Sequence, residues 1–175
     1  MNTILFKRGR LFKKGFTLIE LLVVIAIIGI LTAIVMANFT TAKSKARDAK
    51  RISDIAQLQL TLEQIFDKCN QYPLIYNTLG VLTTTSVVEY PSSDTCKKND
   101  GTTDYQLGDF ISVIPKDSFG NNYSYISSSD GMDYVLRATL ENYNSNVLDD
   151  DVDSPIGLSI DCNDSPSYYY CVQPK

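Results

Sequence analysis

The chain has 175 residues, with 16 basic and 20 acidic side chains, no histidine and four cysteines. This length allows one compact domain plus an extra segment. Without histidine the commonest general base is absent, and no nucleophile elbow, phosphate loop or metal-binding spacing is visible. The acidic balance argues against nucleic acid as a partner, because phosphate contacts need clustered Lys and Arg. The composition therefore excludes the common enzyme classes and favours a structural role.

A basic leader precedes a long apolar stretch. Residues 1–15 contain no acid and carry Lys7, Arg8, Arg10, Lys13 and Lys14. From Phe16 to Ala42, Glu20 is the one charged residue. As a helix, residues 16–42 would span about 40 Å at 1.5 Å per residue. That length exceeds the roughly 30 Å hydrocarbon core of a bilayer and the apolar core of about 7–15 residues in a secretory signal peptide. A transmembrane segment is therefore predicted over residues 16–42.

The charge of Glu20 distinguishes this segment from simpler alternatives. An ionised side chain in a spanning helix costs on the order of 3 kcal/mol at the bilayer centre, and less near the interface. The first cations downstream, Lys43 and Lys45, would lie more than about 30 Å away along the helix. The partner must come from another molecule or from a new chain end close to Glu20. A plain signal anchor, or a signal peptide cleaved near Val35-Met36-Ala37, gives this carboxylate no role.

All four cysteines follow the apolar stretch, at Cys69, Cys96, Cys162 and Cys171. An even number of cysteines beyond a membrane segment indicates disulfides in an oxidising, extracytoplasmic space. Of the three pairings that four cysteines permit, Cys69–Cys96 and Cys162–Cys171 are favoured because they close short loops. The alternative is a zinc site, which the absence of histidine and of a Cys-x-x-Cys spacing disfavours.

The residues Lys13-Lys14-Gly15-Phe16-Thr17-Leu18-Ile19-Glu20, continued by apolar residues to Leu31, form a dense pattern. It closely resembles the class III leader and N-terminal helix of type IV pilins and type II secretion pseudopilins. The resemblance implies cleavage between Gly15 and Phe16 by a membrane aspartyl peptidase, and N-methylation of Phe16. It also implies that Glu20 acts in assembly, by pairing with the free amine of an adjacent subunit's first residue.

The resemblance further implies a function and a set of partners. The chain is expected to be a prepilin that is cleaved, N-methylated and polymerised into a type IV pilus or pseudopilus. Its partners would be copies of itself, minor pilins, the prepilin peptidase and methyltransferase, and an assembly platform in the cytoplasmic membrane. It would cross that membrane once, with its C-terminal domain outside, before joining an extracytoplasmic or cell-surface filament. The alternatives are a signal-anchored binding domain that never polymerises, and a bitopic hydrolase or sensor. A pilus, a secretion pseudopilus and a DNA-uptake filament stay equally open, as does a major or minor subunit.

The second half of the helix is predicted over residues 43–68, as the start of an extracytoplasmic domain that covers residues 43–175. Side chains repeat there at helical spacing, at Ile52, Ile55, Ala56, Gln59, Leu62, Ile65 and Phe66. Asn70 and Pro73 should end the helix. Ala37 stands where the family often has a proline linked to local unwinding, which leaves Gly29 as the weak point. The basic stretch Lys43–Arg51 is interpreted as pairing between subunits rather than contact with DNA.

The rest of the domain is predicted to be a loop over residues 69–113 and a sheet region over residues 114–175. The sequence from Ile114 to Tyr125 resembles the entry to the sheet of major pseudopilins. Strands are expected at Tyr123–Ser127, Tyr134–Leu140 and Tyr168–Val172, the last as an edge strand. The predicted fold is α+β: a long N-terminal hydrophobic helix packed through its second half on a small antiparallel sheet.

An acidic segment, Asn146–Asp153, raises the question of a metal. Related pseudopilins bind calcium in a loop near the sheet, and calcium requires several oxygen ligands. The segment has no EF-hand spacing, so a solvated acidic loop is the main expectation. Calcium bound by Asp149, Asp151 and Asp153 is the alternative, and no other cofactor is expected.

Overall fold

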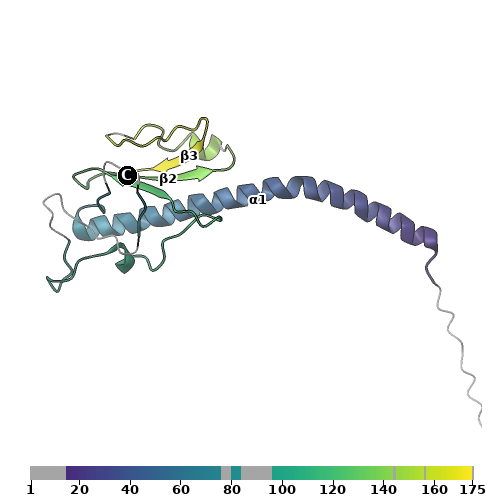
Figure 1. The fold of residues 1–175 in the computed structure, drawn as a ribbon, viewed down its shortest axis with the longest axis horizontal. Coiled ribbons are helices and arrows are strands. Elements are labelled where there is room, and N and C mark those ends of the chain that lie inside the picture. Colours follow the sequence, from purple (N-terminus) through teal and green to yellow (C-terminus); the bar gives the residue numbers. More distant parts are fainter. Residues whose placement is uncertain (1–14, 76–79, 84–95, 144, 156, 175) are drawn as a thin grey trace, which may run out of the picture. The chain divides into compact units, whose positions relative to one another are not determined.

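The computed structural model describes residues 15–75, 80–83, 96–143, 145–155 and 157–174. The chain divides into two compact units, Met1–Thr41 and Ala42–Lys175. Its elements, in chain order, are α1 (Leu18–Cys69), the 3-10 helix η1 (Leu107–Asp109), β1 (Ser124–Ser127), β2 (Tyr134–Leu140), α2 (Ser145–Leu148) and β3 (Tyr168–Val172) (Figure 1). One long helix and an antiparallel sheet confirm the predicted α+β class. The bounds of β2 and β3 agree with prediction, and β1 begins one residue later.

Helix α1 ends at the predicted place. Asn70 has φ 53°, in the left-handed region where asparagine is tolerated, and its N–H donates to the carbonyl of Phe66 at 2.7 Å. The helix cannot continue through that residue. The backbone N–H of Tyr72 then donates to the carbonyl of Gly131 at 2.8 Å, which ties the end of the helix to the turn after β1.

The three strands form one antiparallel sheet in the order β1-β2-β3. Leu136 in β2 pairs with Tyr125 of β1 on one side and with Val172 of β3 on the other. The turn between β1 and β2 includes Gly131, with φ 70°, where an added Cβ would lie 3.3 Å from Gln71 and Leu74. Because side chains alternate across a strand, this register puts one set of residues on each face of the sheet.

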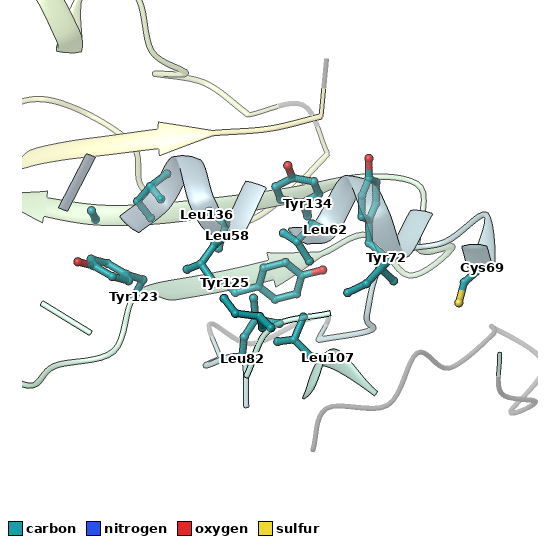
Figure 2. Packing of buried hydrophobic residues seen from close by; sticks show 14 of the residues in the cluster. Leu58, Leu62, Cys69, Tyr72, Leu82, Leu107, Tyr123, Tyr125, Tyr134 and Leu136 are labelled. Carbon is teal, nitrogen blue, oxygen red and sulfur yellow. The ribbon is translucent and has the colours of Figure 1, made fainter. Parts of the chain in front are cut away.

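The second half of α1 packs on one face of the sheet and builds the main core. Figure 2 shows Leu58 and Leu62 of α1 beside Tyr125 of β1. Tyr72 and Tyr134 meet edge to face, with ring centroids 4.6 Å apart. The fully or almost fully buried members of this cluster include Ile55, Leu58, Leu62, Ile65, Leu107, Tyr125, Tyr134 and Leu136. Burial of a large apolar side chain contributes about 1.5–3 kcal/mol, so this face carries most of the hydrophobic stabilisation.

The set of α1 residues predicted at helical spacing to face the sheet has the correct period, but one of its positions is wrong. Ala56 is exposed, whereas Leu58, which this set omitted, is 1% exposed. Gln59, its one polar member, is half-buried and donates from Nε2 to the carbonyl of Gln173 at 3.1 Å. This half-buried position therefore tolerates a polar side chain, because a backbone carbonyl satisfies its amide donor.

The opposite face of the sheet is covered by the segment that leads into β3. Its buried residues are Ile126, Val135, Cys162 and Cys171, with Val152, Leu158, Ile160 and Tyr169 packed against them. These residues alternate along each strand with those of the main core. The sheet is therefore the middle of three layers.

On their edges away from β2, the backbones of β1 and β3 also have hydrogen-bond partners. Tyr125 of β1 exchanges two hydrogen bonds with Gly80, at 2.9 and 3.0 Å. In β3, the N–H of Cys171 donates to Asp151 Oδ2 at 2.7 Å, and its carbonyl accepts the N–H of Val152 at 3.2 Å. Short irregular segments thus flank the sheet on both sides.

A buried ion cluster joins α1 to the residues after β2. The Arg51 side chain is 4% exposed and donates from Nη1 to Asp48 at 2.7 Å and to Glu141 at 2.8 Å. Asp48 also accepts the backbone N–H groups of Glu141 and Asn142, at 2.9 and 3.0 Å. Arg47 pairs with Glu141 as well. Hydrogen bonds from Arg47, and then from Arg51, lower the pKa of Glu141 to about 2.

This cluster corrects the interpretation of the basic stretch Lys43–Arg51. Arg47, Lys50 and Arg51 have acidic partners within the same chain, Glu141, Asp54 and Asp48 among them. The sequence did not show this because the most important partner lies 90 residues away from Arg51. Pairing between subunits is therefore not needed to explain these cations.

The structure contains the two disulfides that the short loops favoured, Cys69–Cys96 and Cys162–Cys171. Their sequence separations of 27 and 9 residues correspond to about 3.5 and about 2.6 kcal/mol of loop-closure stabilisation. Cys69 and Cys96 belong to the main core, whereas Cys162 and Cys171 belong to the cluster on the other face. Each disulfide thus fastens a loop to a different side of the sheet.

Candidate functional site

The described part of the first unit is an apolar helix with an exposed surface. Its large hydrophobic side chains are exposed, from 92% for Phe16 to 49% for Val23. The helix is long and apolar enough to cross a membrane and reaches a mean hydropathy of 3.0. An exposed apolar surface all around a helix requires lipid or other apolar helices as its surroundings. Thr32, a polar residue of this stretch, donates from Oγ1 to the carbonyl of Ile28 at 2.7 Å, so its hydroxyl is satisfied within the helix.

Glu20 closes the first turn of α1. Its Oε2 accepts hydrogen bonds from the backbone N–H and the hydroxyl of Thr17, both at 2.8 Å, while its own N–H donates to Thr17 Oγ1 at 3.3 Å. This reciprocal pair is a capping box, which satisfies two donors that a helix start leaves free. Thr17 was not among the predicted partners of Glu20, although the Thr-x-x-Glu spacing is the signature of this motif.

Gly15 and Phe16 lie just before this helix start, outside regular structure. No heavy atom lies within 4 Å of the position that a Cβ on Gly15 would occupy. The glycine is therefore not required by packing, and its backbone is open to approach by another molecule. Phe16 is 92% exposed. The predicted cleavage residues and the predicted assembly residue thus lie together at the start of one exposed helix.

A second group of functional side chains lies beside β3. The carboxylates of Asp151, Asp153 and Asp164 each place an oxygen within 4.8 Å of the others, and we refer to them as the carboxylate cluster. Two oxygens bound to one calcium ion at 2.3–2.6 Å could be separated by about this distance. Two of the predicted ligands, Asp151 and Asp153, are therefore brought together.

The cluster contains unsatisfied buried oxygens. Asp151 Oδ1 and Asp164 Oδ1 are buried without a hydrogen-bond partner, whereas Asp151 Oδ2 accepts the N–H of Cys171. Burial, together with the charges of Asp164 and Asp153, raises the pKa of Asp151 to about 7, although the hydrogen bond from the N–H of Cys171 lowers it in part. Unpaired buried carboxylate oxygens are costly. A divalent cation would satisfy both oxygens and offset the repulsion, so these residues fit calcium.

The third predicted calcium ligand, Asp149, is outside the cluster. Its Oδ1 accepts the hydroxyl of Tyr143 at 3.1 Å. The first part of its segment is also not the expected loop, because α2 occupies Ser145–Leu148 and buries Leu148. Asp164 takes the third place, and no local sequence pattern points to it. Asp164 lies 13 residues after Asp151 and 11 residues after Asp153, in the loop that the Cys162–Cys171 disulfide closes.

The fold and the helix start define a class of protein. A long helix that packs on a small sheet through its second half, and presents an apolar first half with one acid after a Gly-Phe pair, is the arrangement of a pilin-like filament subunit made as a prepilin. In agreement, a family model described as the prokaryotic N-terminal methylation motif matches residues 10–36.

Similarity to known proteins extends well beyond this motif. The chain is 34% identical over 118 residues to type II secretion system core protein G of Vibrio cholerae, which covers 67% of this chain and 73% of that protein. It is 32% identical over 124 residues to the protein of the same name in Escherichia coli, covering 71% and 79%. It is also 34% identical to type IV major pilin protein PilA of Myxococcus xanthus over 67 residues, 38% of this chain and 30% of the pilin.

The chain belongs to the family of type II secretion system core protein G. It is a membrane-anchored prepilin, a structural subunit that is cleaved, N-methylated and polymerised. No solved structure matches it at a significant level.

Proposed function

We propose that this chain is the repeating subunit of a type II secretion pseudopilus, and that it assembles through Glu20 after cleavage between Gly15 and Phe16. The observation that carries the proposal is the position of Glu20, one turn into an exposed apolar helix and just after an open Gly-Phe bond. Two relatives that are identical to the chain at about a third of the aligned positions are named as core proteins of type II secretion systems. The pilin relative matches a shorter part.

In the single chain the Glu20 carboxylate is held by Thr17. Cleavage creates a free amine on Phe16, which supplies a positive charge where the helix has no other cation. A neighbouring subunit can then offer its terminal amine to Glu20. A buried ion pair barely recovers its desolvation cost, so the gain is register between subunits rather than stability. In the filament the apolar helices exchange lipid for one another, and packing must hold them together.

We also propose the topology and the partners of the precursor. Both disulfides lie in the unit that starts at Ala42, so this unit belongs in an oxidising space outside the cytoplasmic membrane. The basic leader then stays on the cytoplasmic side, accessible to a prepilin peptidase and methyltransferase. The polymer would grow from an assembly platform in the same membrane and would incorporate related minor pilins.

The first prediction concerns the mature N-terminus. Mass spectrometry of the chain purified from its filament or membrane is expected to show a first residue Phe16 that carries one methyl group. The matched comparison is the same chain from cells without the prepilin peptidase, where the leader should remain. A chain that stays intact from Met1, or that begins at Asn38 as after ordinary signal cleavage, would overturn the proposal.

A second candidate function, calcium binding, is favoured by the two unsatisfied carboxylate oxygens. We propose that Asp151, Asp153 and Asp164 hold a calcium ion, which requires several oxygen ligands and is attracted by concentrated negative charge. Bound calcium would fasten the segment that follows α2 to the loop that carries Asp164. The ion would thus contribute to the stability of the globular unit rather than to any chemical reaction.

The proposal makes opposite predictions for Asp164, which lies in the carboxylate cluster, and for Asp149, which was predicted as a ligand but lies outside it. Asp164→Asn is expected to weaken calcium binding by at least about tenfold, since even outer-shell partners of a metal change its affinity by roughly 10–100-fold. Asp149→Asn, which removes the same charge outside the cluster, should leave the affinity unchanged within about twofold. Isothermal titration of the detergent-solubilised chain with calcium chloride measures both. Equal losses in the two variants would contradict the assignment of ligands.

A further inference from the structure

The carboxylate cluster is assembled from two segments that meet at one residue, Cys171. Asp151 and Asp153 come from the segment that follows α2, and Asp164 comes from the loop between Cys162 and Cys171. Nothing in the hydrogen-bond pattern of Asp164 fixes its Oδ1, which is buried without a partner. Its position must therefore be set by the chain on either side of it.

On the first segment, residues 151 and 152 hold the backbone of Cys171 from both sides. Asp151 Oδ2 accepts the N–H of Cys171 at 2.7 Å, and Val152 donates its N–H to the carbonyl of Cys171 at 3.2 Å. The other oxygen of Asp151, Oδ1, is buried without a hydrogen-bond partner. Asp151 is thus oriented by β3 itself.

On the second segment, the disulfide joins Cys171 to Cys162, two residues before Asp164. Cys162 is 1% exposed and Cys171 is fully buried, among apolar residues of the face that α1 does not cover. The carbonyl of Asp161 accepts Arg137 Nη1 at 2.8 Å, and this contact is exposed. The covalent bond is therefore the buried connection that carries Asp164 to the same residue that orients Asp151.

We propose that the Cys162–Cys171 disulfide positions Asp164 against Asp151 and Asp153, so that the affinity of the carboxylate cluster for calcium depends on this bond. The inference rests on the calcium binding proposed above and adds a positioning role for two cysteines. By linkage the dependence is reciprocal, because a ligand that binds better to the disulfide-bonded form must favour that form.

The chain offers a matched control in its other disulfide. Cys69–Cys96 closes a longer loop, 27 residues against 9, but lies in the main core. Its removal should therefore disturb the stability of the unit at least as much. A difference in calcium affinity between the two double cysteine variants then reports the positioning of Asp164 rather than general destabilisation of the unit.

Calcium chloride is titrated into the full chain in detergent, in a buffer without thiols so that the disulfides stay intact. The same titration is carried out on the double variants Cys162→Ala/Cys171→Ala and Cys69→Ala/Cys96→Ala. Loss of the first disulfide is expected to weaken binding by roughly 10–100-fold, the range for groups that orient metal ligands. Loss of the second should change it by less than about threefold. Unchanged affinity in Cys162→Ala/Cys171→Ala overturns the inference and leaves calcium binding intact. No binding by the native chain overturns both, but not the filament function.

A second measurement needs no variant and so does not depend on the folding of one. The native chain is equilibrated with a dithiol reagent, which is oxidised to its cyclic disulfide as each protein disulfide becomes two thiols. Alkylation and mass spectrometry then give the fraction of each disulfide that remains. Calcium is expected to raise this fraction for Cys162–Cys171 and not for Cys69–Cys96. An equal effect on both, or none on either, overturns the inference.

Discussion

Replacing Glu20 with alanine is expected to lower filament yield by at least about 100-fold, while the chain still enters the membrane and loses its leader. In an assembled filament the change would leave the terminal amine of a neighbouring Phe16 without its carboxylate. Stranding one member of a buried pair costs roughly 3–5 kcal/mol, which corresponds to a factor of 100 or more in an assembly equilibrium. The loss of the capping box with Thr17 adds a smaller effect, about 0.5–2 kcal/mol, on the start of α1.

The measurement is the amount of subunit in sheared or cross-linked filaments, together with export of proteins by the type II secretion system. Thr32→Val is the matched control, because it also removes a polar group from the apolar helix, but one that bonds only to Ile28 within its own turn. It should leave filament yield nearly unchanged. Normal filaments from Glu20→Ala would favour the signal-anchored, non-polymerising alternative. Lost filaments with normal protein export would argue for a pilus instead of a pseudopilus.

Replacing Arg51 with alanine is expected to destabilise the globular unit by roughly 3–5 kcal/mol, the usual range for breaking a buried ion pair. The Arg51 side chain is 4% exposed, and its removal would leave Asp48 buried at 7% exposure with one charged partner fewer. Asp48 orients the backbone of Glu141 and Asn142 just after β2, so the loss extends to the link between α1 and the sheet. Such a change is a large part of the 5–15 kcal/mol that usually stabilises a domain.

Chemical denaturation of the detergent-solubilised chain, followed by near-ultraviolet circular dichroism of its tyrosines, measures this loss. Lys45→Ala on the same helix is the control and should change stability by less than about 0.5 kcal/mol, because Lys45 is exposed. A similar small effect for Arg51→Ala would show that the cluster contributes little. The pKa of Glu141 is lowered in the folded chain, so its contribution is present above pH 4.5 and is lost as the pH falls toward 2.

Local patterns predicted most of the fold. Strands β2 and β3 follow from alternating β-branched and aromatic residues, and the end of α1 follows from Asn70 and Pro73, because each signal lies within the element that it determines. The predicted set of sheet-facing residues on α1 was less accurate, since helical spacing allows either Ala56 or Leu58 to face the sheet. Only the position of Tyr125 and Leu136 against the helix decides for Leu58.

Two of the missed features depend on residues that lie apart in the sequence. Arg51 pairs with Glu141, 90 positions away, and Asp164 lies beside Asp151 and Asp153, which precede it by 13 and 11 positions. A single sequence contains no local signal for such contacts, because chain topology creates them. The Thr17–Glu20 pair is different, since the Thr-x-x-Glu spacing at a helix start is a local signal from which the cap is predictable.

The coverage of the sheet has a consequence for a subunit that must gather at high local density. Gly80 occupies the hydrogen-bonding side of β1 at Tyr125, and Asp151 and Val152 occupy that of β3 at Cys171. Open strand edges would invite sheet-to-sheet growth and amyloid-like aggregates. With hydrogen bonds already formed at these positions and both faces covered, the described sheet offers crowded globular units a poor template for strand addition, and ordered growth is left to the helices.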